Sequence, residues 1–160
     1  MFVRKWIPAC FAITAVSIAA PVVFASAAST IKAEIQSIYK QADAAASRKD
    51  INGAVAFYAD PRLQASVRQG ISSLMSMTTS AQFVTRIISV DVPKDNTFEA
   101  TVVVNQHFQG LIKRGNRIGV AVADAKVRQF WTKQGNRWGV LRSRVLSLHR
   151  TLNGQAVNGF

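Results

Sequence analysis

Residues Val127–Arg150 read VRQFWTKQGNRWGVLRSRVLSLHR, with the residue types of two strands joined by a turn. Two runs rich in β-branched and aromatic residues flank a turn at Lys133–Asn136. Gly135 and Asn136 tolerate the positive φ that a tight turn requires. The stretch therefore predicts a β-hairpin in the last part of a small basic domain.

The segment before this hairpin carries the same strand pattern back to Phe83. Between Thr97 and Phe108, apolar and polar side chains alternate, which predicts one buried face and one wet face. Pro93–Asn96 has the composition of a turn, and Asp124 falls in a short connection. The predicted strands are Phe83–Val92, Thr97–Phe108, Arg117–Val122, Lys126–Lys133 and Trp138–Leu148.

Helical periodicity comes first in the chain. A first helix, capped by Ser29 or Thr30, ends near Ser47–Lys49, and its apolar positions are Ile31, Ile35, Ile38, Tyr39 and Ala42. Asp50 can cap a short second helix that carries Ile51, Val55 and Tyr58 on one side. Asp60-Pro61 predicts the start of a third helix, which ends near Met77–Ser80 and whose apolar face holds Leu63, Val67, Ile71 and Leu74.

Helices followed by a run of strands indicate an α+β fold, in which N-terminal helices pack on a curved antiparallel sheet. A curved sheet closed by helices forms a cone with a central cavity. Residues 28–150 make the domain, and residues 151–160 are predicted to be a flexible tail. Gly115–Val120 echoes Gly135–Val140, which indicates two turns of one chemistry rather than a repeat architecture.

The N-terminus has the pattern of a secretory signal peptide. Arg4 and Lys5 precede the apolar run Ile7–Phe24, and Ala25-Ser26-Ala27 is an A-x-A cleavage site. Cleavage of residues 1–27 predicts an exported protein, periplasmic or secreted. The alternative is an uncleaved membrane anchor, because an apolar run of about 18 residues is just long enough to span a bilayer.

Removal of residues 1–27 leaves 133 of the 160 residues, with 18 basic residues against 8 acidic ones. It also removes Cys10, the only cysteine, so no disulfide or thiolate metal site is expected. The positive charge favours anionic partners, such as an envelope surface or a small acid, or it is simply a solvated basic surface. No run of five basic residues exists, which argues against a nucleic-acid arm.

Three motifs in this order resemble those of the NTF2-like superfamily, which includes the SnoaL-like and DUF4440 groups. They are RKDINGAVAFYAD at Arg48–Asp60, FWTKQGNRW at Phe130–Trp138 and VLRSR at Val140–Arg144. The resemblance implies a cystatin-like cone, and a homodimer through the sheet as in many relatives. Two features depart from the family: Pro61 opens a helix directly, and arginines stand where the closing strand often carries histidines. The superfamily includes enzymes, binding modules and interaction domains, so the fold does not fix the function.

Catalytic groups are few. A cyclase or isomerase in this fold needs a buried carboxylate base. None of the carboxylates considered falls on a face that the pattern predicts to be buried: Asp60, Asp91, Asp95, Glu99 and Asp124. His107 lies on a wet face, His149 lies near the tail, and no metal-ligand spacing or G-x-S-x-G elbow occurs. No catalysis, metal or cofactor is therefore expected, and an enzyme is kept as an alternative.

The predicted binding site rests on the closing strand. By alternation, Arg142 and Arg144 share one side of that strand with Trp138, Val140 and Leu146. If that side faces the cavity, the arginines need an anionic partner, because an unpaired buried charge is costly. The further candidate ligand-binding residues are Arg128, Gln106, Trp131 and Tyr58. The other possibility is that the arginines lie in water at the rim of the sheet.

Two functions follow as expectations. The first is an exported domain that binds a small acidic or amphipathic molecule in its cavity, without catalysis. The second is an envelope interaction module of a secretion-type assembly, anchored by residues 7–24 and docking through its sheet or basic surface. The direction in which Arg142 and Arg144 point separates an acidic ligand from a merely basic surface.

Overall fold

The computed structural model describes residues 27–114 and 117–159. The predicted signal peptide up to residue 26, and the turn at Gly115-Asn116, lie outside the described residues. The helices are α1 (Ala27–Ser47), α2 (Ile51–Val55) and α3 (Pro61–Met77). The strands are β1 (Thr78–Asp91), β2 (Glu99–Arg114), β3 (Arg117–Gln134), β4 (Arg137–Leu152) and β5 (Gln155–Ala156).

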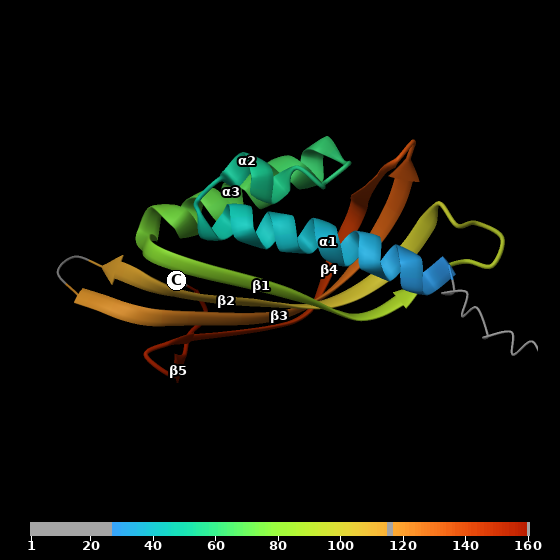
Figure 1. Ribbon diagram of the computed structural model, residues 1–160. Helices are drawn as coiled ribbons and strands as arrows, with labels where there is room; N and C mark the ends of the chain where they lie inside the picture. The colour runs from blue at the N-terminus through green and yellow to red at the C-terminus, as the bar shows by residue number, and fades with distance from the viewer. Residues whose placement is uncertain (1–26, 115–116, 160) are drawn as a thin grey trace, which may run out of the picture.

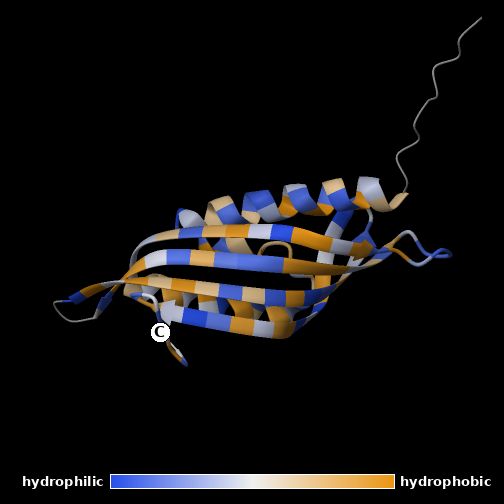
Figure 2. Cartoon of the chain, turned by 90° about the horizontal axis from the view of Figure 1, so that it is seen from below, coloured by the Kyte–Doolittle hydropathy of each residue, from blue (hydrophilic) through white to orange (hydrophobic). Residues whose placement is uncertain are grey.

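The five strands form one antiparallel sheet in chain order, β1-β2-β3-β4-β5, and the three helices lie together on one face of it (Figure 1). We call the face toward the helices the inner face and the opposite one the outer face. Figure 2 views the outer face, with α1 running along the β1 edge and β4 at the opposite edge. The predicted α+β cone is confirmed.

The strands are longer than the sequence patterns indicate. Arg117–Val122 and Lys126–Lys133, predicted as two strands, form the single strand β3. Asp124, predicted in a connection, lies within β3 opposite His107 and His149. The alternation in fact continues through this region, because small alanines on the inner face alternate with larger residues on the outer face. Small side chains hid the strand signal, since the prediction relied on bulky β-branched residues.

The end of the chain is also part of the sheet. β4 continues to Leu152, and the residue pairs Thr151–Ala156 and Leu152–Gln155 join it to β5. Asn153 (φ 52°) and Gly154 (φ 80°) make the turn between them, using the left-handed backbone region that glycine and asparagine tolerate. Residues 151–156, which the sequence analysis assigned to a flexible tail, are therefore sheet and turn in the structure.

The predicted caps of α2 and α3 are present, whereas α1 begins at Ala27, before the predicted cap at Ser29 or Thr30. The Asp50 carboxylate accepts a hydrogen bond from the backbone N–H of Gly53 at 2.9 Å. The Asp60 carboxylate accepts one from Leu63 N–H at 2.7 Å, and Pro61 occupies the first turn of α3. Each carboxylate satisfies a backbone donor that the helix itself leaves free. These two short-range patterns fix where α2 and α3 begin. None of the described helices is both long enough and apolar enough to cross a membrane.

The main core lies between α1 and the inner face of the sheet. The Tyr39 ring meets the Trp131 ring edge to face at 5.4 Å, and Phe57 stacks on Trp131 at 5.5 Å. Around them are the buried residues Ile31, Ile35, Ala100, Val102, Val104, Val127, Trp138 and Val140. Trp131 and Trp138 are thus core residues.

The β1 edge of the sheet is sealed by polar side chains of α1. Gln36, Asp43 and Ser47 recur at helical spacing and so lie on one side of α1. They accept hydrogen bonds from alternate N–H groups along the strand: Phe83 to Ser47 at 3.2 Å, Thr85 to Asp43 at 2.6 Å and Ile87 to Gln36 at 3.4 Å. A free strand edge is a template for further pairing, and α1 removes that template here.

Candidate binding cavity

A cavity of about 230 Å³ lies between the helices and the inner face of the sheet. Its wall is mostly apolar, and α1, α2, α3 and the first three strands all contribute to it. The apolar lining residues are Ala42, Ala46, Ala54, Phe57, Val67, Ile71, Phe83, Phe108, Ala123 and Ala125. The alanines of β3 open this space, because their short side chains leave room between the sheet and the helices.

The cavity has a few polar groups, which come from α1, β1, β2 and the segment after α2. They include the Tyr58 hydroxyl, the Gln106 amide and the Asp43 carboxylate. Asp43 accepts two hydrogen bonds from Thr85, one from the hydroxyl at 2.8 Å and one from the backbone N–H at 2.6 Å. Burial raises the pKa of Asp43, and the Thr85 hydrogen bonds oppose that rise. A small number of polar groups in an apolar pocket is the usual composition of a ligand site.

Gln129, only 1% exposed, hydrogen-bonds with two tyrosines beneath this cavity. Its Oε1 accepts a hydrogen bond from the Tyr39 hydroxyl. Burial raises the pKa of the Tyr58 phenol to about 12, and a hydrogen bond with Gln129 works against that rise. Burial also raises the pKa of Tyr39. Both phenols are therefore neutral hydrogen-bonding groups at ordinary pH, and they are not candidates for phenolate chemistry.

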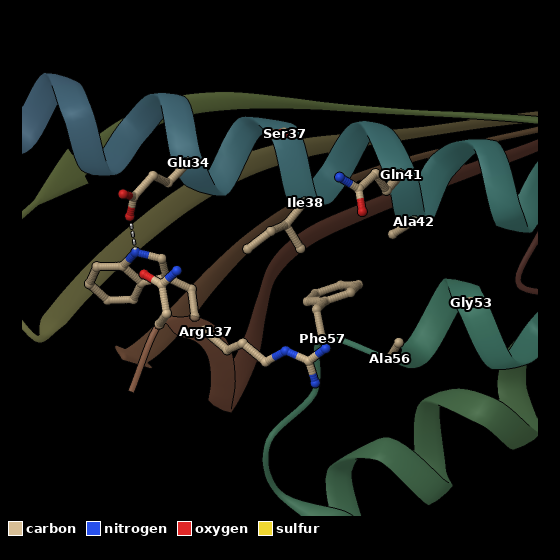
Figure 3. A pocket seen from close by; sticks show the side chains of 11 residues that line it. Glu34, Ser37, Ile38, Gln41, Ala42, Gly53, Ala56, Phe57 and Arg137 are labelled. Atoms are coloured by element: carbon tan, nitrogen blue, oxygen red, sulfur yellow. Dashed lines mark hydrogen bonds between the residues drawn. The ribbon is translucent and has the colours of Figure 1, made fainter. Parts of the chain in front are cut away.

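An open groove of about 560 Å³ lies beside the cavity, between α1, α2 and the β3–β4 turn (Figure 3). Glu34 closes one end by accepting hydrogen bonds from Trp138 Nε1 at 2.5 Å and Lys133 Nζ at 2.9 Å. The hydrogen bond with Lys133, followed by that with Trp138, lowers the pKa of Glu34. Arg137 reaches across the groove toward Phe57. Phe57 and Ala42 line both spaces and so form the wall between groove and cavity.

The structure brings together only some of the residues predicted to form the site. Tyr58 and Gln106 line the cavity. Trp131 is 2% exposed and belongs to the core behind it. The three remaining residues of the prediction are exposed side chains of β3 and β4 that do not line the cavity: Arg128, Arg142 and Arg144. The lining therefore contains no guanidinium for an acidic ligand.

A β-bulge explains why Arg142 and Arg144 face outward. Trp131 pairs with Val140, but Phe130 pairs with Arg142, so Leu141 is an extra residue in β4. Each extra residue moves the following side chains to the opposite face. Val140 is therefore fully buried, whereas Arg142 lies on the outer face with its guanidinium 4.8 Å from the Phe130 ring. The expectation that Arg142 shares a side with Val140 assumed an unbroken alternation and is wrong.

The sequence analysis did not single out Asp43. Its carboxylate lies partly inside the cone, because Asp43 is the fourth residue after Tyr39 and immediately follows buried Ala42. The available signal was a lone acidic residue beside the apolar stripe of a predicted helix. The five carboxylates weighed from the sequence did not include this partly buried one.

Two other sequence expectations concern histidine and metal binding. His107 lies on the outer face, where its Nδ1 is 2.8 Å from Asp124 Oδ1, and both side chains are largely exposed. Within residues 27–114 and 117–159, no group of three His, Cys, Asp or Glu side chains is placed to hold a metal ion. His107 is one of the residues that border the cavity, but its ring pairs with Asp124 on the outer face.

Comparison with known proteins identifies the fold. No protein-family model and no curated protein matches this chain. Three solved structures are similar to it at low sequence identity. They are the intermembrane space region of chloroplast protein ARC6 (TM-score 0.54, 13% identity, 75% of this chain and 96% of that chain), a type 2 hexachlorocyclohexane dehydrochlorinase, LinA (0.56, 10%, 82% and 91%), and a putative scytalone dehydratase from Novosphingobium aromaticivorans (0.54, 8%, 74% and 86%).

These similarities and the observed topology define the class: the chain has the NTF2-like α+β cone fold, as its sequence motifs predicted. At these identities the similarity establishes the fold alone. The neighbours are two named as enzymes and one named as a region of a chloroplast protein, so the same cone occurs in different settings. The function of this chain must be argued from its own cavity and surface.

Proposed function

We propose that the protein binds a small, neutral, amphipathic molecule inside its cone. The observation that carries the proposal is the cavity of about 230 Å³, with an apolar wall and the polar groups of Tyr58, Gln106 and Asp43. An apolar cavity of about 150 Å³ can hold benzene, so this one has room for a somewhat larger ring. The polar groups would orient a hydroxyl or amine of the ligand.

The charge of the lining supports a neutral rather than an acidic ligand. Among the described residues that line the cavity there is a carboxylate, Asp43, and no lysine or arginine. A carboxylate ligand would meet the Asp43 charge in a place of reduced dielectric, where like charges repel strongly. The amphipathic part of the original expectation is therefore retained and the acidic part is not.

We further propose that this binding takes place outside the cytoplasm, after cleavage behind Ala27. The charged start, apolar run and A-x-A site of residues 1–27 support export. The mass of the protein recovered from cells tests this proposal. A mature start at Ala28 agrees with it, and retention of residues 7–24 in a membrane fraction contradicts it.

Filling the cavity should abolish binding. The wild-type protein is expected to melt about 5 °C higher in p-cresol or indole at roughly ten times their Kd, because ligand binding to the native state stabilises it. Benzoate at the same concentration should give a smaller shift. Ala125→Phe places a ring in the cavity and should remove the shift with p-cresol, as measured by thermal unfolding and calorimetry.

The matched control is Ala65→Phe, the same change at an exposed position of α3. It should keep the p-cresol shift of the wild type. If Ala125→Phe is folded and still shows the full shift, the molecule binds elsewhere. If benzoate stabilises the wild type more than p-cresol does, the ligand is acidic and the proposal of a neutral ligand fails.

A second candidate function is acid–base catalysis on a molecule bound in the cavity. It is favoured by Asp43, whose raised pKa brings a carboxylate base closer to neutral pH. Two similar structures are named as a dehydrochlorinase and a putative dehydratase, names that denote elimination. A molecule that binds in the cavity should then be chemically changed by the wild type and unchanged by Asp43→Asn. Equal recovery of unchanged molecule from both proteins would favour binding alone.

A further inference from the structure

The two long edges of the sheet differ. At the β1 edge, side chains of α1 cover alternate backbone N–H groups, as described above. At the other edge, the short strand β5 pairs with Thr151 and Leu152 alone. Near the start of β4, Val140 N–H donates to Phe57 O and Val140 O accepts from Ala59 N–H, both at 2.9 Å. The middle of β4 lies between these two covered ends.

That middle segment, Leu141–His149, is an open strand edge. Beyond it, Val157 N–H donates to Arg150 O at 3.0 Å and so begins the next covered part. In the described part of the chain, no backbone N–H or C=O group of residues 141–149 makes a backbone hydrogen bond on the side away from β3. An unpaired strand edge offers a regular row of donors and acceptors to an incoming strand.

The side chains of this edge are apolar on one face of the sheet and cationic on the other. On its inner face Val145 and Leu148 are 56% and 46% exposed, because α1 packs mainly against β1 at the opposite edge of the sheet. On its outer face stand the exposed side chains of Arg142 and Arg144. An added strand would thus have apolar contacts on one face and cationic contacts on the other.

Neighbouring residues of β3 reinforce the positive charge. Arg128 pairs with Arg144, and Lys126 pairs with Ser147, on the same outer face. The four cationic side chains of this outer face, Lys126, Arg128, Arg142 and Arg144, are exposed. The ion pairs of the described residues join Lys133 to Glu34 and His107 to Asp124, so none of these four cations has a carboxylate partner there. The patch is therefore complementary to an acidic segment.

We propose that Leu141–His149 docks an extended peptide segment of another protein as an additional strand. Acidic residues at every second position of that segment would face Arg142 and Arg144. The apolar residues between them would cover Val145 and Leu148, and backbone hydrogen bonds would supply sequence-independent affinity. This surface is separate from the cavity and does not depend on a ligand inside the cone.

The same features disfavour a second copy of this chain at the edge. Pairing of two β4 edges would bring Arg142 and Arg144 of both copies into one small interface, and like charges on adjacent strands are destabilising. An acidic partner strand removes the repulsion that a second copy would create.

The test uses the full-length chain and three fluorescent ten-residue peptides. One alternates Glu with Val, one has the same composition with all Glu residues before all Val residues, and one alternates Lys with Val. Fluorescence anisotropy should show that the alternating Glu peptide binds about tenfold more tightly than either of the others. Hydrogen exchange should slow within residues 141–149 when it binds.

Two variants of the edge and two matched controls locate the binding. Val145→Lys puts a charge on the apolar side of the edge, and Arg142→Glu with Arg144→Glu reverses the cationic side. Val145→Lys should weaken binding of the alternating Glu peptide about tenfold. The variant with both arginines changed to Glu should bind the Lys peptide more tightly than the alternating Glu peptide. Val120→Lys and Lys113→Glu alter exposed residues of the outer face away from β4 and should leave both affinities unchanged.

Several results of these experiments would overturn the proposal. Equal binding of the alternating and blocked Glu peptides would show charge attraction without strand pairing and would overturn the proposal. So would loss of binding in the control variants, or failure of all three peptides to bind. If sedimentation shows a dimer that Val145→Lys dissociates, the occupant is a second copy and the proposed partner is wrong.

Discussion

Trp131→Ala is expected to lower the free energy of unfolding by about 3–5 kcal/mol, the usual range for removal of a large buried aromatic. For a domain of this size the midpoint of thermal unfolding should fall by roughly 10–20 °C. Trp131 is 2% exposed and stands where α1, the segment after α2, and β3 meet. Circular dichroism during thermal and urea unfolding measures both quantities.

The size of this effect follows from the contacts of the ring. Phe57 stacks on Trp131 at an interplanar angle of 11°, and Tyr39 meets it edge to face. Truncation removes both aromatic contacts and leaves a void that two rigid elements border. A sheet and a long helix cannot collapse into such a void at little cost, so the cavity contribution should be near its upper range.

Phe130→Ala is the matched control, since it removes a ring from the next residue of the same strand. Phe130 faces outward, is half-buried and lies beneath the Arg142 guanidinium at 4.8 Å. Its loss should cost about 1 kcal/mol, because exposed cation–π contacts contribute little. If the two variants proved equally destabilised, the assignment of inner and outer faces along β3 would be incorrect.

The assignment of faces also marks how far the sequence could predict this structure. Local chemistry was sufficient for the three helices and for the caps at Asp50 and Asp60, because each cap depends on residues three positions apart. Alternation was sufficient for the inner face of β2, where Val102 and Val104 are fully buried. Such features need no information from distant parts of the chain.

The bulge at Leu141 does need distant information. Val140 hydrogen-bonds with Phe57 and Ala59, and a side chain at Gly139 would approach the Ala59 Cβ to 2.8 Å. The chain after α2 therefore presses against the start of β4 and fixes it there. The sheet then needs an extra residue to continue, which reverses the direction of Arg142. No pattern within β4 reveals a contact with a segment about 80 residues earlier.

The same limit applies to the cavity. The sequence analysis named Tyr58 and Gln106 because one ends a helical stripe and the other follows an apolar strand face. It missed Asp43, whose surroundings are set by the approach of Thr85 on β1. Polar residues at the margin of a helical stripe can be solvated or buried, and only the neighbouring strand decides which.

Gln129→Leu is expected to lower the free energy of unfolding by about 1–3 kcal/mol, although it adds apolar surface to a buried site. The reason is that the Tyr39 hydroxyl, in a side chain only 1% exposed, loses the Oε1 acceptor. A buried donor left without a partner costs more than its hydrogen bond contributes. Urea unfolding of the purified variant gives the value.

Tyr39→Phe decides whether this explanation is correct. Tyr39→Phe alone should be mildly destabilising. In the Gln129→Leu background, the same change removes the hydroxyl that has lost its acceptor and should restore part of the lost stability. The double variant should then be more stable than the sum of the two single effects predicts, by about 1 kcal/mol or more. Additive effects would show that Gln129 acts through packing, and the hydrogen-bonded link between α1 and β3 beneath the cavity would not be an energetic unit.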